Sequence, residues 1–178
     1  MCDTAIKEIL EKFHSNMKLH CTEFIKIWKN YDTDKSNFIE AKELKNFVRD
    51  LLASTPDKVY DQKVIDDYTE TVIDIFDMNN DGKFSIHELA KLLPVEENFV
   101  KQFQNVSLTE FEAIFQHYDY NNDNTIKGDE ITAFVKDVMN AQGLTTAEMK
   151  DIEIHAACIK DLYGGVLQKE NFKTLLLN

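Results

Sequence analysis

The chain has 178 residues, of which 43% are hydrophobic, and this is enough to bury a folded core. Its 32 acidic and 20 basic residues give a net charge of −12, which disfavours nucleic acid and anionic membrane surfaces as partners. No apolar run is long enough to span a membrane, and no signal peptide is expected. Three cysteines without a CxxC motif favour a reduced, cytoplasmic chain and argue against a zinc site.

Helical patterning flanks an acidic segment near the N-terminus. Residues 1–19 are expected to form an N-terminal helix. Phe24, Ile27, Trp28 and Tyr31 share one face of a second predicted helix, which leads into the acidic segment Asp32–Glu43. A further apolar stripe begins at Leu44, and residues 54–57 are expected to form a loop.

The acidic segment recurs twice at similar spacing, as Asp77–Glu88 and as Asp119–Glu130. Each copy has twelve residues and lies between apolar stripes of helical period. Repeats of this length indicate successive helix-loop-helix units. The sequence therefore predicts an all-α fold of the EF-hand type, with short β-strands between paired loops.

Local signals mark where the later helices start. Pro94 suits the first turn of a connecting helix that runs to Phe103. Ser107 and Glu110 have the spacing of a capping box. Thr145 and Glu148 have the same spacing and predict a helix over 146–159.

A fourth unit is predicted at Lys160–Asn171, where the apolar framework recurs without the acidic residues. Lys160 stands at its first position, Leu162 at its third and Asn171 at its twelfth. This loop is expected to bind no metal.

The three acidic loops carry the oxygen donors that Ca²⁺ prefers. A twelve-residue calcium loop uses side chains at positions 1, 3, 5, 9 and 12 and the carbonyl of position 7. The first loop offers Asp32, Asp34, Ser36, the carbonyl of Phe38, Glu40 and Glu43. The second offers Asp77, Asn79, Asp81, the carbonyl of Lys83, Ser85 and Glu88. The third offers Asp119, Asn121, Asp123, the carbonyl of Thr125 and Glu130.

Two positions depart from the ideal calcium loop. Position 6 requires a positive φ, and Gly82 meets that need while Asn37 and Asn124 tolerate it. Lys127 stands at position 9 of the third loop and cannot donate an oxygen. The sequence therefore predicts three Ca²⁺ sites, with Mg²⁺ as a competitor and the third site weaker than the second.

Apolar residues at position 8 predict how the loops pair. Ile39, Phe84, Ile126 and Leu167 are each expected on a short strand that joins two neighbouring loops. The third loop therefore needs the fourth as a structural partner. We expect one pair of units over 20–93 and a second pair over 94–178.

The chain resembles a known family. The segments Phe24–Asp34 and Glu43–Leu52 are similar to the third hand of the calbindin, calretinin and secretagogin group. Asp81–Phe84 and Leu92–Phe99 are similar to the fourth hand and the linker after it. The resemblance runs from about residue 9 to the C-terminus. It implies cytosolic calcium buffering or sensing by hands packed into one globule, although that family has six hands and this chain has four.

Three functional classes follow from these features. A calcium buffer is favoured over a sensor that exposes a hydrophobic groove to target proteins, because methionines are few beyond residue 17. A calcium-triggered photoprotein is the rival among enzymes, but a single tryptophan and scattered histidines argue against it. A monomer without enzymatic activity is expected.

Overall fold

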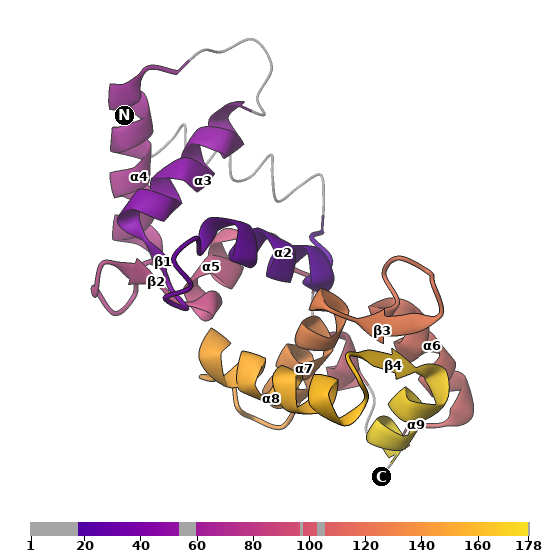
Figure 1. The fold of residues 1–178 in the computed structure, drawn as a ribbon. Coiled ribbons are helices and arrows are strands. Elements are labelled where there is room, and N and C mark those ends of the chain that lie inside the picture. The colour runs from indigo at the N-terminus through magenta and orange to yellow at the C-terminus, as the bar shows by residue number, and fades with distance from the viewer. Residues whose placement is uncertain (1–17, 54–59, 97, 103–105, 178) are drawn as a thin grey trace. The chain divides into compact units, whose positions relative to one another are not determined.

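Helices alternate with very short strands along the chain in the computed structural model, which describes residues 18–53, 60–96, 98–102 and 106–177 (Figure 1). Most of the predicted N-terminal helix, residues 1–17, and the predicted loop at 54–57 lie outside the described residues. The chain divides into two compact units. Unit 1 contains Leu19 and Ile27–Val95, and unit 2 contains His20–Lys26 and the chain from Glu96 onward. That the two pairs are separate domains stays a prediction.

Unit 1 consists of two helix-loop-helix hands. The first hand comprises α2 (Cys21–Tyr31), whose first residues belong to unit 2, then β1 (Ile39–Glu40) and α3 (Ala41–Ala53). The second comprises α4 (Gln62–Phe76), β2 (Lys83–Phe84) and α5 (Ile86–Leu92). β1 and β2 are antiparallel, with Ile39 opposite Phe84, as their position in the loops predicts (Figure 1).

Unit 2 repeats this organisation. η1 (Phe99–Gln102) precedes a hand made of α6 (Leu108–Tyr118), β3 (Thr125–Lys127) and α7 (Asp129–Ala141). The last hand comprises α8 (Met149–Leu162), β4 (Val166–Gln168) and α9 (Lys169–Leu177). Ile126 lies opposite Leu167 in the antiparallel pair β3–β4. The predicted pairing of the third loop with the fourth is confirmed.

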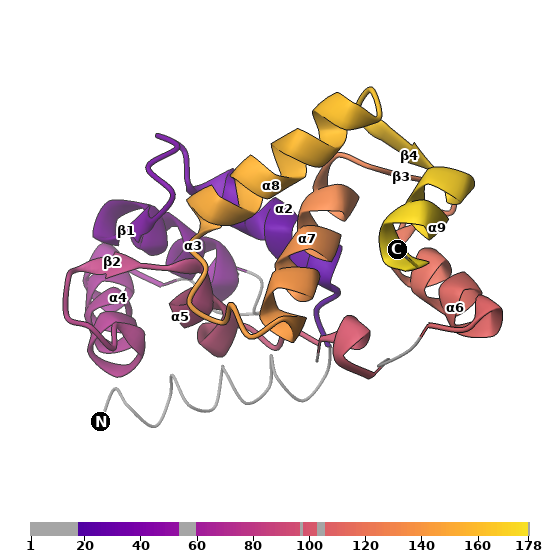
Figure 2. The ribbon, with the colours of Figure 1, turned by 90° about the horizontal axis from the view of Figure 1, so that it is seen from below.

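The core of unit 2 is aromatic. The Phe172 ring lies 4.7 Å from that of Phe134, 5.7 Å from that of Phe115 and 6.2 Å from that of Phe111, measured between ring centroids. Phe172 comes from α9, whereas Phe111 and Phe115 come from α6, and these two helices lie side by side (Figure 2). The fourth hand therefore supplies a central part of this core.

Of the three helix starts predicted from local sequence signals, one is confirmed by the structure and two are wrong. Ser107 caps α6 as predicted, since its Oγ accepts a bond from the amide of Glu110 at 3.3 Å. The predicted helix from Pro94 to Phe103 is wrong, because only Phe99–Gln102 is helical among its described residues. Val95 pairs with Leu19 instead, and the Pro94 carbonyl accepts a bond from the amide of Leu19 at 2.7 Å.

The predicted start of α8 is also wrong. This helix begins at Met149, with Glu148 as its cap and Asp151 as the partner of Glu148. The residues before it still serve the end of α7, because the amide of Leu144 donates to the carbonyl of Met139 at 2.9 Å. The amide of Ala147 then donates to the carbonyl of Leu144 at 3.2 Å. Because residues 144–147 form this turn, α8 begins only at Met149.

Truncating Phe172 tests whether the fourth hand is a structural partner. We expect Phe172→Ala to lower the free energy of unfolding by about 3–5 kcal/mol, because a fully buried ring is replaced by a cavity. Denaturant unfolding in the presence of a chelator measures the effect. Leu162→Ala is the matched control, since Leu162 belongs to the same hand but is 77% exposed. Equal stability of the two variants would contradict a structural role.

Candidate metal sites

Buried carboxylates stand at both ends of each acidic loop. Their side chains belong to positions 1 and 12, and each residue is only 5–9% exposed. They are Asp32, Glu43, Asp77, Glu88, Asp119 and Glu130. Burying a carboxylate is costly unless hydrogen bonds or a cation compensate its charge. Three repeats of this costly arrangement indicate a site for a cation.

Backbone amides hold the closing glutamate of each loop in place. Glu43 Oε1 accepts from the amide of Thr33 at 2.8 Å, and Oε2 accepts from the amide of Glu40 at 3.1 Å. Both oxygens are thereby held at the loop, as a bidentate ligand requires. The equivalent donors are Met78 and Ser85 for Glu88, and Asn121 and Lys127 for Glu130.

The first half of each loop curls around its own side-chain oxygens. In the second loop, Asp77 accepts from the amides of Asp81 and Gly82 at 3.3 and 2.9 Å. Asn79 Oδ1 accepts from the amide of Asp81 at 3.0 Å, and Asp81 Oδ1 accepts from the amide of Lys83 at 2.8 Å. Oxygens at positions 1, 3 and 5 therefore lie inside one turn. The first and third loops use the same pattern through Asp32, Asp34, Ser36, Asp119, Asn121 and Asp123.

Left-handed backbone makes this curl possible. Position 6 has a positive φ in all three loops, as the sequence predicts: Asn37 at 66°, Gly82 at 74° and Asn124 at 63°. Position 4 is also left-handed, which the sequence analysis missed. It is occupied by Lys35, Asn80 and Asn122. Asparagine at two of these three positions was the available signal, because asparagine tolerates this region.

Positions 7 and 9 lie where the loop enters its strand. The carbonyl of Phe38 accepts from Ser36 Oγ at 3.0 Å, while Lys83 and Thr125 begin β2 and β3. Glu40 is partly buried and forms an ion pair with Lys83 at 3.2 Å. Ser85 Oγ donates to Glu88 Oε2 at 2.8 Å, so this side chain supports the closing glutamate.

The first loop concentrates negative charge. Ligand oxygens of Asp32, Asp34 and Glu43 all lie within 4.8 Å of one another. Burial raises the pKa of Asp32, while hydrogen bonds from Ser36 lower the pKa of Asp34. A divalent cation would offset most of the negative charge of this cluster.

A lysine engages one carboxylate of the third loop. Lys127 forms an ion pair with Asp123 across the turn. The hydrogen bond from Lys127 is the main cause that lowers the pKa of Asp123 to about 2. An ion entering this loop must therefore compete with the ammonium group for the oxygen at position 5.

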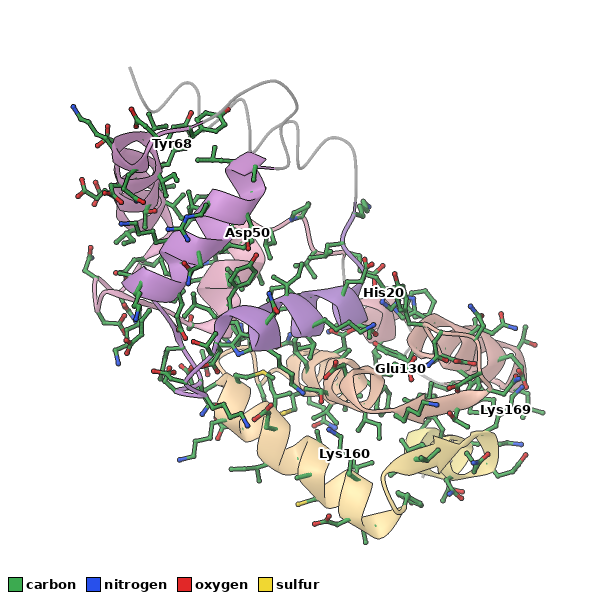
Figure 3. All side chains as sticks on the ribbon, turned by 45° about the horizontal axis from the view of Figure 1, so that its top comes forward. His20, Asp50, Tyr68, Glu130, Lys160 and Lys169 are labelled. Carbon is green, nitrogen blue, oxygen red and sulfur yellow. The ribbon has the colours of Figure 1, made fainter. Side chains whose placement is uncertain are left out.

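The fourth loop keeps its shape but lacks acidic ends. Figure 3 shows Lys160 on α8, where the first ligand would stand, and Glu130 near the start of α7. Lys160 donates to Thr132 Oγ1 at 3.4 Å. Gly164 and Gly165 provide the left-handed turn before β4. Its donor set does not suit a hard divalent ion.

Comparison with known proteins agrees with these loops. Residues 22–93 match the family described as the EF-hand domain pair. Bovine calretinin is 44% identical over 134 residues, covering 70% of this chain and 49% of that protein. Human calbindin is 39% identical over 160 residues, covering 88% of this chain and 60% of that protein. This chain is an EF-hand protein of the calbindin and calretinin type.

The similarity to these relatives covers only part of their length. The chain spans about half the length of the calretinins it matches. Caltubin from the great pond snail aligns with 91% of this chain and 100% of its own, but with a TM-score of 0.30 and 19% identity. In the described part of this EF-hand chain, every helix is too short or too polar to cross a membrane.

Proposed function

We propose that this chain binds three Ca²⁺ ions in the loops Asp32–Glu43, Asp77–Glu88 and Asp119–Glu130. The observation that carries the proposal is the repeated pair of buried carboxylates at positions 1 and 12. Between them the loop turns further oxygens inward, which gives the six to eight donors that Ca²⁺ takes. Calretinin and calbindin relatives with 37–44% identity support the same assignment.

Magnesium is a competitor for these loops. Mg²⁺ demands a compact octahedron of six oxygens, whereas Ca²⁺ accepts a larger and less regular shell. A closing glutamate with both oxygens held at the loop suits the larger ion. We therefore propose that Ca²⁺ binds more tightly than Mg²⁺ at each loop.

We propose buffering as the role of this binding. A sensor needs an apolar surface that a target helix can occupy, and such grooves are often rich in methionine. Met139 and Met149 are buried, whereas Met78 is 64% exposed within the second loop and Lys91 contacts its sulfur. The large exposed apolar side chains in the described residues are scattered over α4, α6, α8 and the loops between helices. A cytoplasmic, monomeric chain fits this role.

Removing one closing glutamate at a time tests the three sites. We expect calorimetric titration to give three Ca²⁺ per parent chain and two in each of Glu43→Gln, Glu88→Gln and Glu130→Gln. An amide provides one oxygen where the carboxylate provides two, so the ion loses its bidentate ligand. Glu170→Gln in the fourth loop is the control and should retain three ions. Four ions in the parent would show that the fourth loop also binds.

Replacing Lys127 tests the weakness of the third loop. We expect Lys127→Ser to increase Ca²⁺ affinity at that loop, because Asp123 is released and the serine adds an oxygen near the ion. Titration in the Glu43→Gln, Glu88→Gln background isolates this site. Lys150→Ser removes an exposed lysine from α8 and controls for net charge. Unchanged affinity relative to the parent background would show that the ion pair does not limit binding.

A fluorescent hydrophobic dye separates buffer from sensor. We expect only a small rise in dye emission when Ca²⁺ is added, since the described methionines do not form an apolar groove. Calmodulin under the same conditions serves as the positive control, because its hands open on a Met-rich groove. An emission increase comparable to that of calmodulin would identify a sensor.

A further inference from the structure

Four metal-binding side chains meet in unit 2 outside the acidic loops. They are His20 and Cys21 at the start of α2, Glu96 after α5, and His117 in the last turn of α6. One ligand atom from each lies within 4.8 Å of the other three. Figure 3 shows His20 at this end of α2. The calcium loops make no use of any of the four.

The distances approach those of a tetrahedral zinc site. Cys21 Sγ lies 3.9 Å from His20 Nδ1 and 3.9 Å from His117 Nε2, and Glu96 Oε1 lies 3.2 Å from His117 Nε2. Tetrahedral ligands at usual Zn–S, Zn–N and Zn–O lengths lie about 3.3–3.6 Å apart. These three separations differ from that range by a few tenths of an ångström, and the remaining pairs lie within 4.8 Å.

Two hydrogen bonds fix the tautomer of His20. The amide of Thr22 donates to His20 Nδ1 at 3.1 Å, so Nδ1 carries no proton and Nε2 carries it. Nε2 then donates to the carbonyl of His117 at 3.0 Å. A ligating histidine commonly donates its other N–H to such a carbonyl. Metal at Nδ1 replaces one amide hydrogen bond and keeps this support.

Aromatic rings fix both imidazoles. Phe99 stacks on His117 with ring centroids 4.1 Å apart and planes at 12°. Tyr120 stacks on His20 at 4.6 Å and 29°, and its hydroxyl donates to Glu23 at 2.6 Å. The imidazoles therefore need little reorganisation to bind an ion, which favours affinity.

Helix capping explains only part of this cluster. Glu96 Oε1 accepts from the amide of Cys21 at 3.1 Å, so Glu96 and His20 both satisfy amides at the start of α2. Capping needs neither the thiol of Cys21 nor the Nε2 of His117. Cys21 is only 1% exposed, and its sulfur faces both imidazoles within this polar group.

We propose that His20, Cys21, Glu96 and His117 form a four-coordinate site for Zn²⁺ or a similar transition-metal ion. One thiolate, two neutral imidazoles and one carboxylate match the ligand types of zinc, and their formal charge of −2 balances the ion. The thiol proton passes to solvent when the metal binds. This proposal departs from the expectation of no zinc site, and it does not depend on calcium binding by the loops.

Cobalt provides a direct test, because a thiolate bound to Co²⁺ gives a near-ultraviolet charge-transfer band. The full chain is titrated with Co²⁺ in excess Ca²⁺ and Mg²⁺, so that hard ions occupy the acidic loops, and Zn²⁺ affinity is then measured by competition. We expect one tetrahedral Co²⁺ per chain, displaced by Zn²⁺. Cys21→Ser should abolish the band, and His117→Gln should weaken Zn²⁺ binding by at least about 10–100-fold, the loss found for mere supporting residues.

Matched controls identify the ligands. Cys2→Ser and Cys158→Ser should retain the band, as should His155→Gln, since Cys158 and His155 are exposed on α8. Circular dichroism without metal checks that Cys21→Ser and His117→Gln fold, and Glu96→Gln provides a third variant if either does not. A parent without a thiolate band, or a band that survives Cys21→Ser, would overturn the proposal.

Discussion

Each pair of loops is joined by a short antiparallel ladder with one buried apolar residue from each strand. Ile39 faces Phe84 in unit 1, and Ile126 faces Leu167 in unit 2. All four side chains are fully buried or nearly so. In each acidic loop, the strand of the ladder ends three or four residues before the closing glutamate. It therefore sets the position of the last ligand relative to the first, and the geometry of every loop depends on it.

The acidic loops concentrate repulsion that only their hydrogen bonds and a cation can offset. Amides at positions 5 and 6 bind the first aspartate, and amides at positions 2 or 3 and at position 9 bind the closing glutamate. These bonds hold the oxygens inward. In the third loop, Lys127 forms an ion pair with Asp123, so this carboxylate is already partly neutralised. Differences between loops therefore arise from single side chains on a common backbone.

Local patterns in the sequence predicted the hands, their pairing and the cap at Ser107, because each depends on residues close together in the chain. The helix expected after Pro94 failed because Val95 pairs with distant Leu19. The start of α8 was misplaced because the turn that ends α7 extends to Ala147. The cluster of His20, Cys21, Glu96 and His117 could not be predicted from local sequence patterns. Its members come from three segments that only the folded chain brings together.

The fourth hand contributes to the core of unit 2 although its loop has no acidic residue at the first or the last position. Phe172 and Leu167 are fully buried, and Lys160 occupies the place of the first aspartate. Under the proposed assignment of three calcium sites, this packing does not depend on the concentration of calcium. On the same proposal, calcium binds and leaves the third loop while the fourth hand acts as a permanent scaffold. The proposal thus leaves the integrity of the C-terminal core independent of ion occupancy on one side of the ladder.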